Sequence, residues 1–247
     1  MNPLVLEAWR GLSSFNAFHK AWLSYMFLQA CALAVWWPDA DITDRLEMHD
    51  APEPLLAVLI ALGVSVAYLS LRLGAEEILL EGQFSLREWV TSEVGIGRLA
   101  AGSVLAHLLS AGYLVLMSSP LLLVSYTVGG GTVPLMGTLL GATLLMALFF
   151  RLIGATLYFA MGHLGSETFV LLRLVFVIVY LPVALAVESL SHFMLCYHAM
   201  NAAPLYPDFG VPPMVLFVAV YGLGSAALVA VLCRQMAGYR RRMAQGH

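Results

Sequence analysis

Three residues late in the chain have the types and spacing of a candidate metal site. Glu188 and His192 are four positions apart, which places them on one face of a helix, and His198 follows shortly afterwards. Carboxylate and imidazole groups are ligands that Zn and Cu accept. The chemistry would be metal binding on an outer loop, and the alternative is a set of polar groups at a membrane interface. The sequence favours the alternative, so we expect no resident metal.

Ionisable residues inside long apolar segments are a second group of candidates, because such residues are rare in a membrane and often functional. His107 could relay protons or form a hydrogen bond to a neighbouring helix. Arg151 and Arg173 are expected to extend towards lipid head groups or to pair with Glu167.

No arrangement for catalysis accompanies these residues. An intramembrane hydrolase would need paired carboxylates, a serine with a base, or a histidine–carboxylate metal set in mutual reach, and no such spacing occurs. The chain has no GxxxxGK[ST] loop, so it is not expected to hydrolyse ATP itself. The cysteines have no CxxC spacing that would indicate a disulfide framework or a metal knuckle. We therefore predict that the chain is not an enzyme and holds no cofactor.

The elements that must position these residues are long apolar segments. Of the 247 residues, 61% are hydrophobic and 11% are charged. A mean hydropathy of +0.86 leaves too little polar surface for a water-soluble globule. We predict an all-α polytopic membrane protein with a single domain, 1–247. The six expected spans are about 21–37, 55–73, 99–128, 133–161, 169–190 and 214–232.

The positions of the basic residues orient these spans. Among the 12 Lys and Arg residues, only Arg45 falls outside if the N-terminus is inside. The residues on the inner side are then Arg10, Lys20, Arg72, Arg87, Arg98, Arg151, Arg173, Arg234, Arg240, Arg241 and Arg242. An excess of Lys and Arg in short cytoplasmic loops sets membrane topology, so both termini are predicted to be cytoplasmic. The cluster Arg240–Arg242 should anchor the last span beside anionic head groups, and nucleic acid is not an expected partner.

Two stretches outside the spans are predicted to lie at the membrane interface. Residues 1–19 have apolar residues at spacings of three and four, which predicts an amphipathic helix on the cytoplasmic surface. Its apolar face would be formed by Val5, Trp9, Leu12, Phe15 and Phe18. The aromatic stretch 189–213 contains prolines and is predicted to be an external re-entrant segment.

Proline and glycine residues predict the shape of two spans. Pro120 should break or kink the span 99–128, and Gly129–Gly131 should form the tight external turn that follows. Gly137 and Gly141 form a GxxxG step, which allows two helices to approach closely.

The most informative polar segment is the predicted cytoplasmic loop between the second and third spans. Residues 82–97 are predicted to form a short amphipathic coupling helix, joined directly to two spans and suited to receive force from another protein. The alternative is an interfacial helix that lies on lipid. Its apolar residues are Phe84, Trp89, Val90 and Val94, and its charged residues are Arg87, Glu88 and Glu93.

At this loop the sequence resembles the permease subunits of ABC-type exporters that have an N-terminal interfacial helix and six spans. In that family an acidic stretch ending in Glu-Gly precedes a short helix with a Thr-or-Ser and Pro step, and a Gly-Lys pair opens the third span. Glu81-Gly82 matches the first element, and Trp89-Val90-Thr91-Ser92 resembles the helix and its step. Glu93 stands where the proline is usual, and Gly102-Ser103 stands where Gly-Lys is usual.

The resemblance continues in the outer parts of the chain and implies partners. Ser119–Ser125 is similar to the family's Pro-Leu run near the outer end of span three, and 189–213 fits its re-entrant helices. In such exporters two permeases pair around a central path, and two separate ATP-binding subunits, which use ATP and Mg, dock on the coupling helices. The resemblance implies a bacterial cytoplasmic (inner) membrane protein. The apolar and small residues of the second and fifth spans favour a lipid-like, peptide or other amphipathic cargo over a small ion. The residues that the resemblance implies for docking are Phe84, Arg87, Glu88, Trp89 and Glu93.

Two functions of other classes remain open. The chain could be an accessory or scaffold subunit that anchors or regulates a complex without forming a path, which suits the few ionisable residues of its membrane core. It could also be an intramembrane enzyme or metal-handling protein built on His107, Glu188, His192 and His198.

Overall fold

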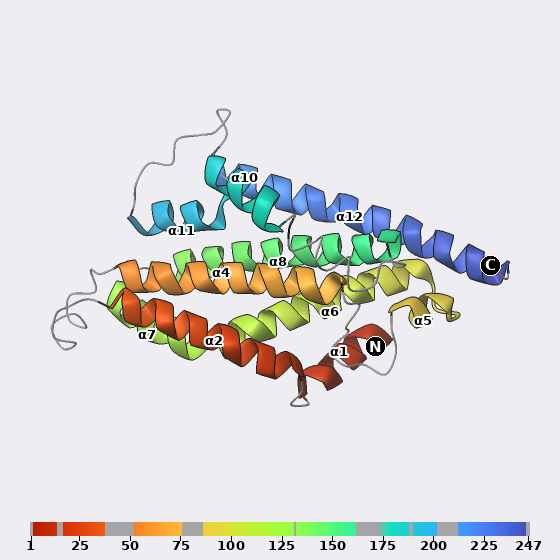
Figure 1. Cartoon of the computed structure of the whole chain (residues 1–247), viewed down its shortest axis with the longest axis horizontal. Coiled ribbons are helices and arrows are strands. Elements are labelled where there is room, and N and C mark those ends of the chain that lie inside the picture. The colour runs from red at the N-terminus through yellow and green to blue at the C-terminus, as the bar shows by residue number, and fades with distance from the viewer. Residues whose placement is uncertain are drawn as a thin grey trace.

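The structure is a computed structural model. It describes residues 2–13, 17–37, 52–75, 86–130, 132–161, 174, 176–187, 190–201 and 212–245. Every regular element in these ranges is a helix and none is a strand, so the all-α prediction is confirmed. The long helices lie lengthwise beside one another and form an elongated bundle (Figure 1).

Four helices in the described part of the chain are long and apolar enough to cross a membrane. They are α4 (Pro52–Ala75), α6 (Ile96–Met117), α8 (Val133–Met161) and α12 (Pro213–Ala244). A bilayer core requires about 20 consecutive apolar residues in a helix. Length and composition therefore agree with the prediction of an integral membrane protein.

The other two predicted spans are not among these four helices. The predicted span 21–37 largely coincides with α2 (Ala17–Val35), a continuous helix of 19 residues whose described side chains begin at Trp22. Part of the predicted span 169–190 lies outside the described residues. Its described part consists mainly of a π-helical turn, η1 (Phe176–Tyr180), and α10 (Leu181–Ala186). The prediction of six spans therefore stays a prediction.

The third predicted span is broken where the sequence predicts a break. α6 ends at Met117, and α7 (Ser119–Gly129) begins after Ser118. Pro120 stands in the first turn of α7, where its missing N–H leaves no helical hydrogen bond unmade. α7 packs against α4 and α2. At its end Gly130 has φ 67°, a left-handed conformation that glycine adopts without a steric penalty.

α4 is the central helix of the bundle. It packs against α2, α7, α8 and α11 (His192–Asn201). Its apolar residues recur at spacings of three and four, which gives a continuous buried face. That face includes Leu55, Val58, Leu59, Leu62, Val66 and Leu69, none more than 2% exposed. Because lipid is as apolar as these side chains, close packing rather than escape from water must hold the helices together.

A hydrogen bond between His192 and Thr143 joins α11 to α8 in the centre of the bundle. The Nε2 atom of the buried His192 lies 2.7 Å from Thr143 Oγ1 on α8. Because the Thr143 hydroxyl donates its only proton to the Leu139 carbonyl at 2.9 Å, it accepts a hydrogen bond from His192, so Nε2 carries a proton. Gly63 of α4 makes room for the ring, since a Cβ at that position would lie 2.5 Å from Nδ1.

Aromatic residues connect η1 to α8 and α12. The ring centroids of Phe176 and Phe150 are 5.3 Å apart with the rings nearly perpendicular, a favourable arrangement for aromatic pairs. The hydroxyl oxygens of Tyr180 and Tyr221 are 3.0 Å apart. Tyr221 also donates a hydrogen bond to the Leu190 carbonyl at 3.0 Å. These bonds join η1, α12 and Leu190, two residues before α11.

Candidate coupling surface at the arginine-rich end

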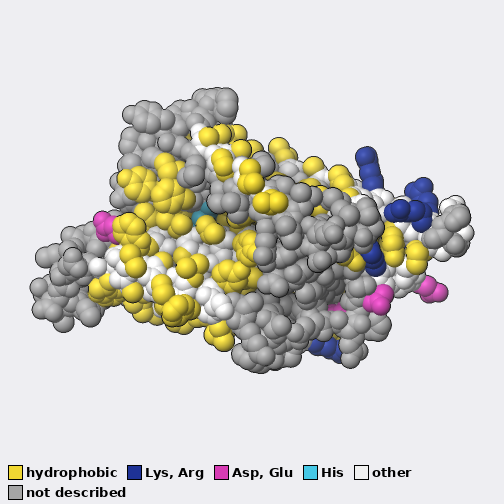
Figure 2. Space-filling model, viewed as in Figure 1, with side chains coloured by type: hydrophobic (Ala, Val, Ile, Leu, Met, Phe, Trp, Pro, Cys, Tyr) yellow, Lys and Arg dark blue, Asp and Glu magenta, His cyan; other side chains and the backbone are white. Residues whose placement is uncertain are grey.

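The basic side chains gather at one end of the bundle. Figure 2 shows Lys and Arg concentrated where α5 and the C-terminus of α12 lie in Figure 1, while hydrophobic side chains cover much of the visible flank. α5 (Leu86–Thr91) is the helical part of the predicted coupling helix 82–97. Residues 92–94 form a bend, α6 begins at Ile96, and 82–85 lie outside the described residues.

α5 is too short to be stable without tertiary contacts, because isolated helices need about 12 or more residues. Leu86 and Val90, one turn apart, are 5% and 0% exposed. At its C-terminal end the Thr91 hydroxyl donates to the Glu88 carbonyl at 2.7 Å, and the Ser92 hydroxyl donates to the Trp89 carbonyl at 2.6 Å. These side chains bond carbonyls that a short helix leaves without helical partners.

Arg87 points from α5 into the junction between α8 and α12. Its guanidinium carbon lies 4.3 Å from the ring centroid of Tyr158 and 5.6 Å from that of Tyr239. One of its terminal N–H groups also donates to the Tyr158 carbonyl at 3.5 Å. A cation over an aromatic face contributes about 0.5–2 kcal/mol, more where water is excluded. Arg87 therefore attaches α5 to both helices.

Arg240 reaches back from α12 to the end of α5. Its Nε donates to the Val90 carbonyl at 2.7 Å, and its Nη2 donates to the Val94 carbonyl at 2.6 Å. A cation is favoured at the negative C-terminal end of a helix, and charge-assisted hydrogen bonds are stronger than neutral ones. The sequence predicts a head-group anchor at Arg240, whereas the structure directs this side chain onto protein carbonyls. Arg241 and Arg242 remain exposed.

The sequence contains a pattern that indicates this role of Arg240, namely helical periodicity that continues past the predicted span. α12 continues to Ala244, well past the end of the predicted span at 232. Leu232 and Met236 are both 0% exposed, and the next position of that face, at the same spacing, is Arg240. Helical periodicity that continues beyond the apolar segment thus indicates that Arg240 faces protein.

Trp89 connects α5 to the N-terminal helix α1 (Pro3–Ser13). Its indole N–H donates to Glu7 Oε2 at 2.9 Å. α1 in turn packs on α6. The Asn2 side-chain amide donates to the Arg98 carbonyl at 2.6 Å, and Gly102 of α6 leaves space for Asn2. α5 is therefore tied to α1, α8 and α12.

The buried face of α1 differs from the predicted apolar face. Leu4 and Ala8 are 0% exposed and Leu12 is 5% exposed, and their spacing of four residues forms a narrow stripe. Trp9, predicted on the same face as Leu12, is 58% exposed. The small side chain of Ala8 permits close packing, so α1 places this stripe against α6 and leaves Trp9 outside. An exposed tryptophan suits a membrane interface.

The five residues predicted at the docking surface therefore do not share one face. Glu88 and Glu93 are exposed. Arg87 and Trp89 are directed towards other helices of the same chain, and Phe84 lies outside the described residues. Exposed carboxylates on a helix that is held from behind form the candidate coupling surface, which we define as Glu88 and Glu93 on and beside α5.

A second polar group lies inside the apolar part of the bundle. The Nε2 atom of His107 is 2.9 Å from Ser103 Oγ, one turn earlier on α6. Arg151 on α8 interacts electrostatically with His107. Arg151 is 4% exposed, so its guanidinium is enclosed and does not extend to the surface as predicted. Glu167 and Arg173 lie outside the described residues.

The candidate metal ligands are not brought together in the described part of the chain. His192 is bonded to Thr143 as described above, while Glu188 and the side chain of His198 lie outside the described residues. No group of three histidine, cysteine or carboxylate side chains that could hold a metal ion occurs among the residues the structure describes.

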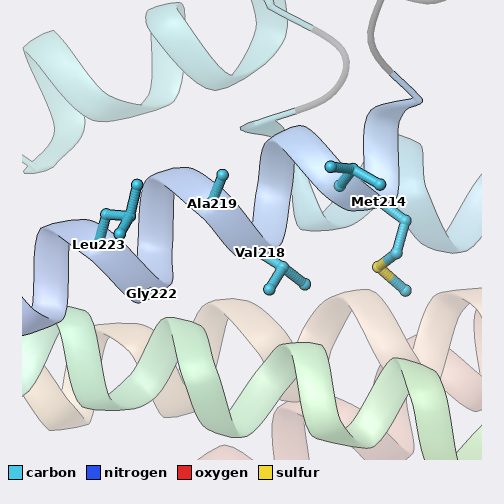
Figure 3. Close-up of a pocket in the computed structure, with 6 residues that line it drawn as sticks. Met214, Val218, Ala219, Gly222 and Leu223 are labelled. Carbon is cyan, nitrogen blue, oxygen red and sulfur yellow. The ribbon is translucent and has the colours of Figure 1, made fainter.

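The outer surfaces of α8 and α12 carry two further features. Gly137 and Gly141 are exposed, and a Cβ at either would meet open space, so the GxxxG step is not used for packing between described helices. A shallow apolar hollow runs along α12 (Figure 3). It is lined by Met214, Val215, Val218, Ala219, Gly222 and Leu223.

Comparison of the chain with protein-family models, with characterised proteins and with solved structures found no match.

Proposed function

We propose that this chain is the permease subunit of an ABC-type exporter. Two copies, or one copy with a similar chain, would form the path, and two separate P-loop ATPase subunits would dock at the arginine-rich end. In this proposal the chain has six spans and both termini are cytoplasmic, in a bacterial inner membrane. ATP and Mg belong to the partner ATPase, and the membrane lipids surround the apolar flank.

One observation carries the proposal. α5 is fastened to α1, α8 and α12 by Trp89, Arg87 and Arg240, while Glu88 and Glu93 remain exposed. A lipid-lying helix would need a free apolar face, but the apolar residues Leu86 and Val90 of α5 are buried. A helix held on one side and charged on the other is suited to contact a soluble protein and to pass force to the spans.

The proposal predicts that a P-loop ATPase co-purifies with the wild-type chain in mild detergent. The double variant Glu88→Lys and Glu93→Lys should lose this partner, because it reverses both charges of the candidate coupling surface. Glu53→Lys is the matched control. Glu53 is also an exposed carboxylate, in the first turn of α4, far along the chain from α5.

The outcome separates the exporter from its alternative. If the wild-type chain brings down no ATPase, or if the double variant retains it, the assignment is wrong. A chain that binds an ATPase but supports no ATP-dependent transport in proteoliposomes would instead be an accessory or scaffold subunit. That alternative is favoured by the small number of buried charges, since Arg151 is the one charged residue classed as buried among the described residues.

A further inference from the structure

Two arginines cross between α5 and α12 in opposite directions. Arg87 extends from α5 to Tyr158 of α8 and Tyr239 of α12. Arg240 extends from α12 to the carbonyls of Val90 and Val94. We call this pair of contacts the arginine clasp. Each helix thus holds the other through a cation.

We propose that Arg240 is the positioning residue that makes α5 and the C-terminal part of α12 move as one body. The inference rests on the proposed function for its consequence, which is that a force applied to the candidate coupling surface is passed to α12. The clasp itself is a property of this chain and does not depend on which partner is bound.

The two carbonyls bonded by Arg240 explain why this residue joins three elements. The Val90 carbonyl belongs to α5, and the Val94 carbonyl belongs to the bend that leads into α6. The two donors, Nε and Nη2, are held at a fixed separation by the planar guanidinium. A lysine ammonium is a single point of charge and cannot present the same rigid pair of donors. The geometry of the side chain matters here as well as its charge.

α12 is the span whose apolar part is least enclosed by the described chain. Of the residues in its apolar window 22% are buried, compared with 72% in the central helix α4. Its packing is mainly on α8 and α6, so a shift of α12 disturbs fewer buried side chains than a shift of α4 would. Arg240 lies 27 residues after Pro213, which corresponds to about 40 Å at 1.5 Å per residue. A movement of α5 would therefore reach the opposite end of α12 through one continuous helix.

Hydrogen exchange of the detergent-solubilised full chain tests the clasp. In Arg240→Ala, backbone amides of residues 86–98 should exchange on the order of tenfold faster than in wild type, because two charge-assisted hydrogen bonds are lost. Arg240→Lys should resemble Arg240→Ala, since the fork is absent from both. Arg241→Ala, the matched control at an exposed neighbour, should exchange at the wild-type rate. Wild-type exchange in Arg240→Ala, or an equal effect in Arg241→Ala, overturns the proposal.

Spin-label distances test whether the two helices move together. One label replaces Thr91 on α5 and the other replaces Met243 on α12, both exposed, in a chain whose own cysteines, Cys31, Cys196 and Cys233, are changed to alanine. The inter-label distance should be the same with and without ATP in the complex with the ATPase, and Arg240→Ala should broaden it. A wild-type distance that changes with ATP contradicts a single body.

Measuring ATPase binding and the stimulation of ATP hydrolysis separately distinguishes a failure of the role of Arg240 from a failure of the proposed function. Arg240→Ala should still bind the ATPase, because Glu88 and Glu93 are unchanged, but permease-dependent stimulation of ATP hydrolysis should fall severalfold. Full stimulation in this variant would overturn the role of Arg240 in coupling. If no ATPase binds the wild-type chain, the exporter assignment fails. The hydrogen-exchange rates and the width of the inter-label distance distribution, measured on the isolated protein, still show whether the clasp holds α5 to α12.

Discussion

Arginine takes three different roles in this chain, and the surroundings of each guanidinium decide which. Arg87 stacks on Tyr158, Arg240 bonds backbone carbonyls, and Arg151 is enclosed beside His107. Insertion scales place the free energy of a charge at the centre of a spanning helix at about 2.5–3.5 kcal/mol. Arg151, 4% exposed in the apolar helix α8, carries such a charge, whereas the guanidinium groups of Arg87 and Arg240 contact aromatic rings and backbone carbonyls at the end of the bundle.

At the same scale, Gly63 controls the position of His192. A methyl group in Gly63→Ala would lie 2.7 Å from His192 Cε1, so the ring must leave Thr143. We expect a loss of about 1–3 kcal/mol of stability, the usual range for overpacking, seen as a lower thermal midpoint in detergent. Cys196, 0% exposed and 3.8 Å from the imidazole, should react faster with a maleimide. Gly112→Ala is the control, because a Cβ there meets open space; equal effects would exclude a role for His192.

At the scale of elements, the short helices are held by a few directional side-chain contacts, whereas the long helices are held by continuous buried apolar faces. α5 depends on two arginines and a tryptophan, and η1 reaches its neighbours through Phe176 and Tyr180. π-Helical turns often occur at functional sites. In contrast, α4 is buried along most of its apolar length. Displacing the short elements therefore breaks a few directional contacts, whereas displacing α4 would disturb the packing of the whole bundle.

Under the proposed function, the exposed GxxxG step of α8 is the surface on which we expect two copies of the chain to pair. Gly137 and Gly141 have open space around them in this chain, and small residues at this spacing allow a second helix to approach closely. Replacing both with leucine should abolish the dimer in size-exclusion chromatography with light scattering. The control is the same change at Gly95 and Gly97, two exposed glycines with open space beside α5. A dimer that survives the Gly137 and Gly141 changes would place the pairing surface elsewhere.

At the scale of the whole molecule, the two ends of the bundle are predicted to face opposite sides of the membrane. Single cysteines at Glu53 and at Met243, both exposed, should be labelled by a membrane-impermeant maleimide from opposite sides in spheroplasts and inverted vesicles. The cytoplasmic position is expected for Met243, because it lies beside Arg241 and Arg242. Labelling of both cysteines from the same side would contradict the predicted topology.

The sequence predicts features that depend on local pattern. Apolar length locates the four long helices, and Pro120 locates the break between α6 and α7. The sequence does not predict the directions of side chains that depend on distant partners. Arg240 bonds a residue 150 positions away, and Trp89 bonds one 82 positions away. The face of α1 that packs on α6 depends on a distant partner as well, since Leu4 and Ala8 are buried there and Trp9 is not.

Because α12 is continuous, the number of residues between Met236 and Arg240 matters as well as their types. Each residue of an α-helix turns the next by about 100°. One extra residue between the buried Met236 and Arg240 would rotate the guanidinium away from the Val90 carbonyl while leaving every side chain of the tail intact. The number of residues between Met236 and Arg240 is therefore set by the position of α5, which another part of the chain provides.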